Sequence, residues 1–294
     1  MRVPLVVEVE PTSWSTVRQL SESLVVPHVF RGQQDAGWGL SPSIERAASR
    51  GGVFPHDIAD REEWILREFA RRSQQHGARV SSESPVDVLA LVQHYGGPTR
   101  LLDFTHSLYV AAFFALEFAA GSSAIWAVNL RSLEDAIAST LGLPQEGGFF
   151  RLSHSKYDAI AHDIMTGRRE ARIVLPLEPF HMHERMSTQQ ALFLFPCDLS
   201  VSFEENLAAS FGCDATELRQ PAKLSVEDVA AGNTTDVPLL RIILSRDLRN
   251  RVLDDLWQMN INAATLFPGL DGFARSLHYH MRAVSSIERW RIEE

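Results

Sequence analysis

Side chains that could bind or polarise a ligand are concentrated in one short stretch, Gln93–Thr105, with the sequence QHYGGPTRLLDFT. It contains a histidine, a tyrosine, an arginine, an aspartate and two threonines. The stretch lies between a helix that should end at Gly96–Pro98 and the apolar run Leu108–Leu116, which predicts a buried helix. Polar groups beside a buried helix are costly unless they find partners, so this cluster predicts the floor of a pocket.

The same residues also permit a purely structural interpretation. Asp103 or Thr105 could cap the helix that follows, and Arg100 could pair with Asp103. His94 near the end of a helix is favourable simply as a cation beside the helix dipole. At the level of the sequence both interpretations stay open.

A second candidate lies earlier in the chain, where Arg31 and Gly32 end a predicted strand and precede the turn Gln33–Gly37. A glycine at this point lets a ligand approach the main chain, and an arginine can bind a phosphate or ribose oxygen. The alternative is a turn glycine beside a surface arginine.

A third polar segment, Arg185–Gln190, leads into the apolar run Ala191–Phe195. Polar side chains at the start of a buried strand can face a site, or they can simply form ordinary hydrogen bonds there. Two His-x-His pairs, His181 with His183 and His278 with His280, lack a third clustered ligand and a zinc signature. No metal site is therefore expected.

Composition limits the possible classes of protein. The chain has 294 residues, 45% of them hydrophobic and 22% charged, which is typical of a globular protein. A net charge of −9 disfavours broad nucleic-acid binding, which relies on a basic face. Two cysteines, Cys197 and Cys213, are too few for a disulfide framework. With no signal peptide and no apolar run long enough to span a membrane, a cytoplasmic protein without membrane contact is expected.

Hydrophobic periodicity and capping signals predict helices early in the chain and strands later, which indicates an α+β protein. The helical half should pack on a mixed or antiparallel sheet. Predicted helices cover about residues 12–24, 43–49, 56–76, 84–95, 105–120, 133–141, 157–165, 246–259 and 271–284. Predicted strands cover residues 25–31, 124–128, 171–177, 191–195 and 239–244, and residues 146–151 and 230–235 are predicted loops.

The three motifs together resemble the FRG domain family. They are Phe30-Arg31-Gly32, the stretch Gln93–Thr105, and Leu266–Gly272, and the resemblance extends from about residue 16 to 280. It implies a single FRG-type domain over residues 1–294, with an FRG motif at 28–34, the second motif at 93–105, a strand-rich part at 122–245 and C-terminal helices at 246–290. The third motif also has the residue types of a turn that precedes a helix, with Asp271 as the N-cap.

A more distant resemblance is to the ADP-ribosyltransferase-like fold, which has a split sheet and uses NAD. It implies that Arg31, Gly32 and Gln33 bind the cofactor, that Tyr95 and Thr99 flank nicotinamide, and that His94 and Arg100 orient these groups. Where those enzymes carry a glutamate this chain has Gln189 and Gln190. Asp103 or Glu184 would then supply the carboxylate, with Gln190 completing the catalytic set.

The resemblance implies ADP-ribosyl transfer or NAD hydrolysis, with a nucleotide-like small molecule and a protein target as partners. Such an enzyme could act as a toxin or phage-defence effector, because loss of NAD stops a cell. The alternative is a module that binds a nucleotide or phosphorylated ligand without catalysis. The missing glutamate favours this second function, because glutamine carries no negative charge.

Overall fold

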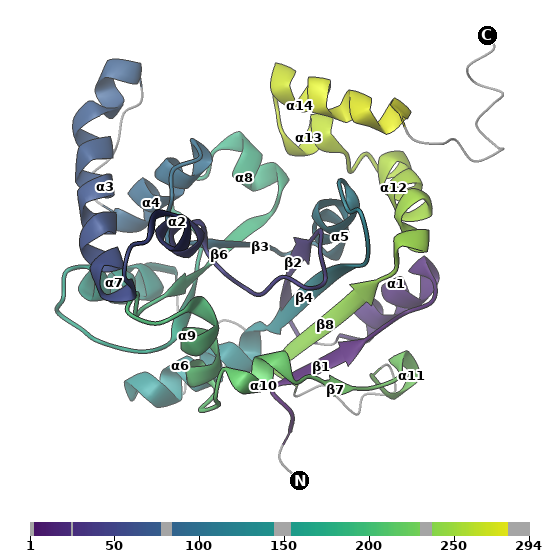
Figure 1. The fold of residues 1–294 in the computed structure, drawn as a ribbon, viewed down its shortest axis with the longest axis horizontal. Coiled ribbons are helices and arrows are strands. Elements are labelled where there is room, and N and C mark those ends of the chain that lie inside the picture. The colour runs from purple at the N-terminus through teal and green to yellow at the C-terminus, as the bar shows by residue number, and fades with distance from the viewer. Residues whose placement is uncertain (1–2, 25, 78–83, 144–153, 230–236, 282–294) are drawn as a thin grey trace.

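The structure is a computed structural model that describes residues 3–24, 26–77, 84–143, 154–229 and 237–281. Its centre is a sheet whose strands follow the order β5-β6-β3-β2-β4-β8-β1-β7 (Figure 1). The strands are β1 Val6–Val9, β2 His28–Gln33, β3 Leu102–Thr105, β4 Ser123–Asn129, β5 Val174–Leu177, β6 Ala191–Pro196, β7 Ala222–Lys223 and β8 Leu239–Leu244. Strand β1 runs parallel to β7 and β8, and the other pairs are antiparallel, so the sheet is mixed. The predicted α+β class is confirmed.

The sheet is weakly joined in its middle, between β2 and β3. These strands share one partner pair, Phe30 with Thr105, whereas β2 pairs along its whole length with β4. Strand β3 pairs instead with β6, from Leu102 to Thr105. Beyond the Phe30–Thr105 pair the two strands therefore separate, and the sheet opens between them.

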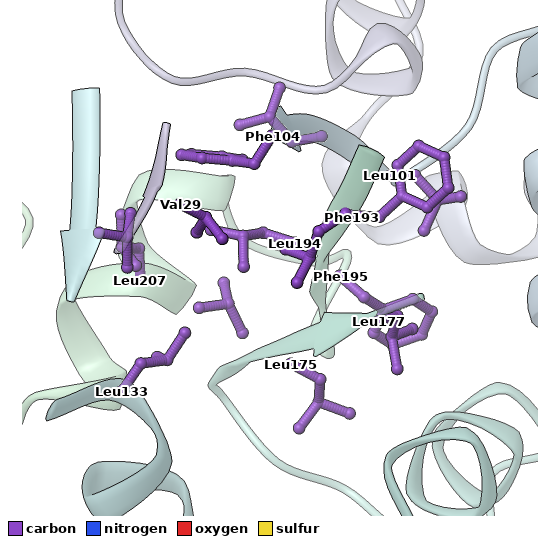
Figure 2. Packing of buried hydrophobic residues seen from close by; sticks show 14 of the residues in the cluster. Val29, Leu101, Phe104, Leu133, Leu175, Leu177, Phe193, Leu194, Phe195 and Leu207 are labelled. Carbon is purple, nitrogen blue, oxygen red and sulfur yellow. The ribbon is translucent and has the colours of Figure 1, made fainter. Parts of the chain in front are cut away.

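Two hydrophobic cores stabilise the sheet, one on each face. The first contains Phe30 and packs beneath α5 (Leu108–Leu116), α12 (Arg249–Gln258), α13 (Ala263–Leu266) and α1 (Trp14–Ser23). The second contains residues of β3, β5 and β6 such as Phe104, Leu175 and Phe193, as Figure 2 shows. It packs against α4 (Pro85–His94), α6 (Leu130–Leu141), α7 (His154–Met165) and α9 (Phe203–Ser210).

The remaining helices lie around these layers. They are α2 Ser43–Gly51, α3 Ile58–Arg72, α8 Glu184–Thr188, α10 Thr216–Arg219, α11 Val226–Asp228 and α14 Leu270–Ser276. Short 3-10 helices cover Pro55–Asp57, Ser73–His76, Arg246–Leu248 and Leu277–Met281. In the part of the chain that the structure describes, no helix is long and apolar enough to cross a membrane.

The apolar helix α5 is buried as predicted, but neither Asp103 nor Thr105 caps it. Ser107 is its N-cap, and the Ser107 hydroxyl accepts a hydrogen bond from the backbone N–H of Val110. Residues 102–105 form strand β3 instead, with alternate burial at Leu102 and Phe104. The sequence obscured this strand because four residues are too few to show a period of two.

Strand β8 has the predicted ends, and the other predicted elements are present with shifted ends. The strands β1 and β7 and the helices α8, α9, α10, α11 and α13 were not predicted. The prediction that Asp271 caps the last helix was wrong. Gly269 occupies the cap position with a φ of 111°, and α14 ends at Ser276, where a 3-10 helix replaces the predicted continuation. The predicted loops at 146–151 and 230–235, and the end of the predicted C-terminal helices, lie outside the described residues.

Candidate functional site

A cavity of about 420 Å³ occupies the place where β2 and β3 separate. Its walls come from parts of the chain that are far apart in sequence. The lining residues are Phe30, Arg31, Gly32, Gln33, Gln34 and Trp38; Ala90, Gln93 and His94; Asp103, Phe104, Thr105 and Phe114; and His183, Arg185, Met186, Gln189, Ala191 and Phe193. This volume is within the range of small-molecule sites.

Arg31 reaches across the opening in the sheet. Its Nη1 donates a hydrogen bond of 2.8 Å to the backbone carbonyl of Asp103 and lies 4.0 Å from the Asp103 carboxylate. Burial lowers the pKa of Arg31, and the nearby Asp103 charge partly opposes this shift. Its Nε is buried and finds no hydrogen-bond partner within the described residues. Arg31 therefore places a partly desolvated cation in the cavity wall.

Gly32 lines the cavity, but a different contact explains the absence of a side chain. A Cβ built at this position would lie 1.9 Å from the carbonyl oxygen of Ala111 and 2.5 Å from the backbone nitrogen of Ala115. Both atoms belong to α5, which crosses directly over β2. The close approach that requires a glycine here is that of helix α5.

Gln33 also lines the cavity, and the fold already uses its amide. Its Nε2 donates to the carbonyl of Gly39 at 2.9 Å, and its Oε1 accepts from the indole N–H of Trp126 at 2.9 Å. These bonds hold the loop that brings Trp38 to the cavity. Gln33 thus positions the wall of the site.

Asp103 is oriented by a short chain of hydrogen bonds. Gln93 donates from Nε2 to Oδ1 of Asp103 at 2.6 Å, and the hydroxyl of Thr99 donates to Oε1 of Gln93. Thr99 is fully buried and does not line the cavity. Its contact with the site runs through Gln93, so Thr99 is a positioning residue in this structure.

Arg100 points away from the cavity into the protein. Its Nε donates to Oε2 of Glu62 at 2.6 Å, its backbone N–H donates to Oε1 of the same carboxylate at 3.1 Å, and its guanidinium lies 4.7 Å from the centre of the Phe195 ring. Both charged side chains are buried. The expected pairing with Asp103 was wrong, because Glu62, 38 residues earlier, takes that place.

Tyr95 lies outside the cavity, in a groove between α3 and the end of α4, with 65% of its surface exposed. His94, its neighbour, does line the cavity. Its ring lies 4.1 Å from that of His183, measured between centroids. Burial lowers the pKa of both histidines, which keeps them uncharged near neutral pH.

His183 and Arg185 are site residues that the sequence interpretation did not select. Both ring nitrogens of His183 are buried without a hydrogen-bond partner in the described part of the chain. The Arg185 guanidinium lies 4.5 Å from the centre of the Phe267 ring. Burial lowers the pKa of Arg185, and Asp103 opposes that shift. The signal that could have found them is their position in a polar run just before a buried strand.

Glu184 and Gln190 are exposed and do not line the cavity. Gln190 adopts a left-handed conformation with a φ of 49° as the chain turns into β6. Gln189 lines the cavity instead, and its Nε2 donates to the carbonyl of Leu266 at 2.8 Å. Among the described residues that line the cavity, Asp103 is the one carboxylate.

Residues 27–123 match the model of a family described as the FRG domain. Over these residues the chain is similar to the FRG domain. The matched segment supplies Arg31, His94 and Asp103 to the cavity, whereas His183 and Arg185 come from beyond it. No curated protein and no solved structure matches the chain. The FRG segment is thus one wall of a cavity that the rest of the chain completes.

Among the described residues, no group of three or more histidine, cysteine, aspartate or glutamate side chains is placed to hold a metal ion. The titratable side chains that line the cavity are Arg31, Arg185, His94, His183 and Asp103.

Proposed function

We propose that the cavity binds a nucleotide with a diphosphate, of the NAD type, and that the protein cleaves NAD by ADP-ribosyl transfer or hydrolysis. The observation that carries the proposal is the contact between Arg31 and Asp103, 72 residues apart, across the opening in the sheet. A partly desolvated cation and an oriented carboxylate thus share one cavity. Arginine suits phosphate oxygens because its donors match their geometry.

The proposed reaction breaks the bond between nicotinamide and ribose. The bonding electron pair leaves with nicotinamide, and positive charge develops on the ribose. A carboxylate close to that charge stabilises the transition state, as in glycoside hydrolysis. Asp103 is the candidate for this role. Arg31 and Arg185 would bind the diphosphate, and the uncharged His94 and His183 rings offer one hydrogen-bond donor and one acceptor each.

A depleted NAD pool arrests a cell. By cleaving NAD, the protein would act as a toxin or phage-defence effector in the cytoplasm. The acceptor of ADP-ribose would be water or a protein target.

A second candidate is a nucleotide-binding module without catalysis. The observation that favours it is the exposure of Glu184 and Gln190 outside the cavity. Among the described residues that line the cavity, the carboxylate is that of Asp103, and it already accepts a hydrogen bond from Gln93. In this alternative, Asp103 only orients Arg31 toward the ligand.

Release of nicotinamide from NAD by the purified protein separates the two functions. The enzyme proposal predicts release by the natural protein and its loss in Asp103→Asn, whose amide oxygen can still accept from Gln93. Glu184→Gln is the matched control, because it makes the same change on an exposed side chain outside the cavity. No release at high protein concentration, with thermal stabilisation by ADP-ribose, would identify the binding module.

A further inference from the structure

Helix α3 packs on the protein along only a narrow strip. Of its 15 residues, Ile58 and Glu62 alone are buried. Trp64 is 56% exposed, although a tryptophan buries a large apolar area when it finds a partner. Figure 1 shows α3 at the outer edge of the molecule, away from the sheet. The helix therefore presents most of its surface to solvent.

A groove of about 600 Å³ runs beside this helix, between α3 and the end of α4. Its lining is mainly apolar and includes Ile65, Phe69, Val92 and the exposed ring of Tyr95, together with Trp64 itself. A contiguous apolar groove of this kind on a surface is typical of an interaction site.

A regular row of exposed residues follows the solvent side of α3, and one of them, Trp64, lines the groove. Asp60, Trp64, Arg67 and Arg71 follow one another at spacings of four, three and four residues, which places them on one stripe of the helix. All four are exposed. The stripe is acidic at its first position and basic at its last two.

This order is self-complementary. When two copies of α3 lie antiparallel about a two-fold axis between positions 65 and 66, Asp60 of each copy faces Arg71 of the other. Trp64 of each copy then faces Arg67 of the other, an arrangement that suits a cation–π contact. A two-fold interface needs such matched groups at symmetric positions of one surface.

We propose that α3 is the interface of a homodimer, with two copies of the helix packed antiparallel along the Asp60–Trp64–Arg67–Arg71 stripe. Trp64 also lines the apolar groove of its own copy, so packing along the stripe would cover one edge of that groove. Arg71 is held at the surface by Glu68, to which it donates at 3.0 and 2.7 Å, and keeps a further donor for Asp60 of the second copy. The proposal does not depend on the ligand of the cavity.

Sedimentation equilibrium of the full chain between about 1 and 100 µM tests the dimer. A tenfold change in affinity moves the concentration of half-dimerisation tenfold, which this range can measure. The natural protein should dimerise, and Trp64→Ala should weaken dimerisation at least about tenfold. Asp60→Arg and Arg71→Glu, each placing like charges face to face at two symmetric contacts, should do the same. Glu63→Arg makes the same charge change as Asp60→Arg on an exposed position off the stripe, and should leave the dimer intact.

Mixing the two charge variants tests the antiparallel register. Asp60→Arg and Arg71→Glu each repel themselves, but in a mixed dimer both symmetric contacts join opposite charges. The mixture should therefore dimerise about as well as the natural protein. A natural protein that is monomeric at 100 µM, or a dimer that Trp64→Ala and Asp60→Arg leave unchanged, would overturn the proposal. A mixture that stays monomeric would overturn the antiparallel pairing.

Discussion

Replacing Glu62 by glutamine tests what holds the Thr99–Asp103 segment beneath the cavity. Glu62 and Arg100 are 1% and 5% exposed, and the Glu62 carboxylate accepts from both the side chain and the backbone of Arg100. Glutamine keeps the size of the side chain but leaves the guanidinium buried without a counter-charge. Removing one partner of a buried ion pair typically costs about 3–5 kcal/mol. Because Arg100 is enclosed by Pro196 and Phe195, we expect little water to reach the guanidinium and reduce this cost.

The assay is equilibrium unfolding in urea, followed by circular dichroism, for the natural protein, Glu62→Gln and Asp103→Asn. The Asp103 side chain is 62% exposed and its contact with Arg31 measures 4.0 Å. Asp103→Asn should therefore lower the free energy of unfolding by less than about 1 kcal/mol. Glu62→Gln should lower it by several times as much. Equal losses for the two variants, or a loss below 1 kcal/mol for Glu62→Gln, would refute the assignment of Glu62 as the partner of Arg100.

Three further changes test other parts of the structure. Gly32→Ala places a Cβ against the Ala111 carbonyl of α5 and should cost about 3 kcal/mol or more in the same unfolding assay; an unchanged midpoint would contradict the close helix crossing. Thr99→Val removes the hydroxyl that holds Gln93 and should cost about 1 kcal/mol, with weaker binding of ADP-ribose measured by calorimetry. Burial raises the pKa of Glu45 from 4.5 to about 7, so the folded state holds this proton more tightly than the unfolded state. The stability from Glu45 should then fall as pH rises from about 4.5 to 7, and melting temperatures of Glu45→Gln should lack this part of the pH dependence.

The sequence predicted those elements whose signal is local. Ser84 with Pro85 marked the start of α4, and the Ser84 hydroxyl does accept from the Asp87 N–H. The run Leu239–Leu244 forms a strand over the predicted residues. Strand β3 could not be predicted, because its four residues are defined by pairing with β6, which lies some 90 residues later.

The candidate site shows the same division. Arg31, His94 and Asp103 were selected from local pattern and resemblance, and all three line one cavity. Arg100 was assigned to the site through the resemblance, but its side chain pairs with Glu62 on another helix. Gly32 carried a real signal of close approach, yet the sequence could not say whether a ligand or a helix makes that approach. Such distinctions depend on tertiary packing.

The most direct test of the proposed function is calorimetric titration of the protein with ADP-ribose, the part of NAD that carries the diphosphate. The natural protein should bind it, and Arg31→Ala should bind at least about tenfold more weakly, in keeping with the loss of a charged hydrogen bond. Arg71→Ala, a matched change on the exposed helix α3, should bind like the natural protein. No binding at millimolar ADP-ribose, or equal affinity for Arg31→Ala and the natural protein, would contradict the proposed anion site at the opening of the sheet.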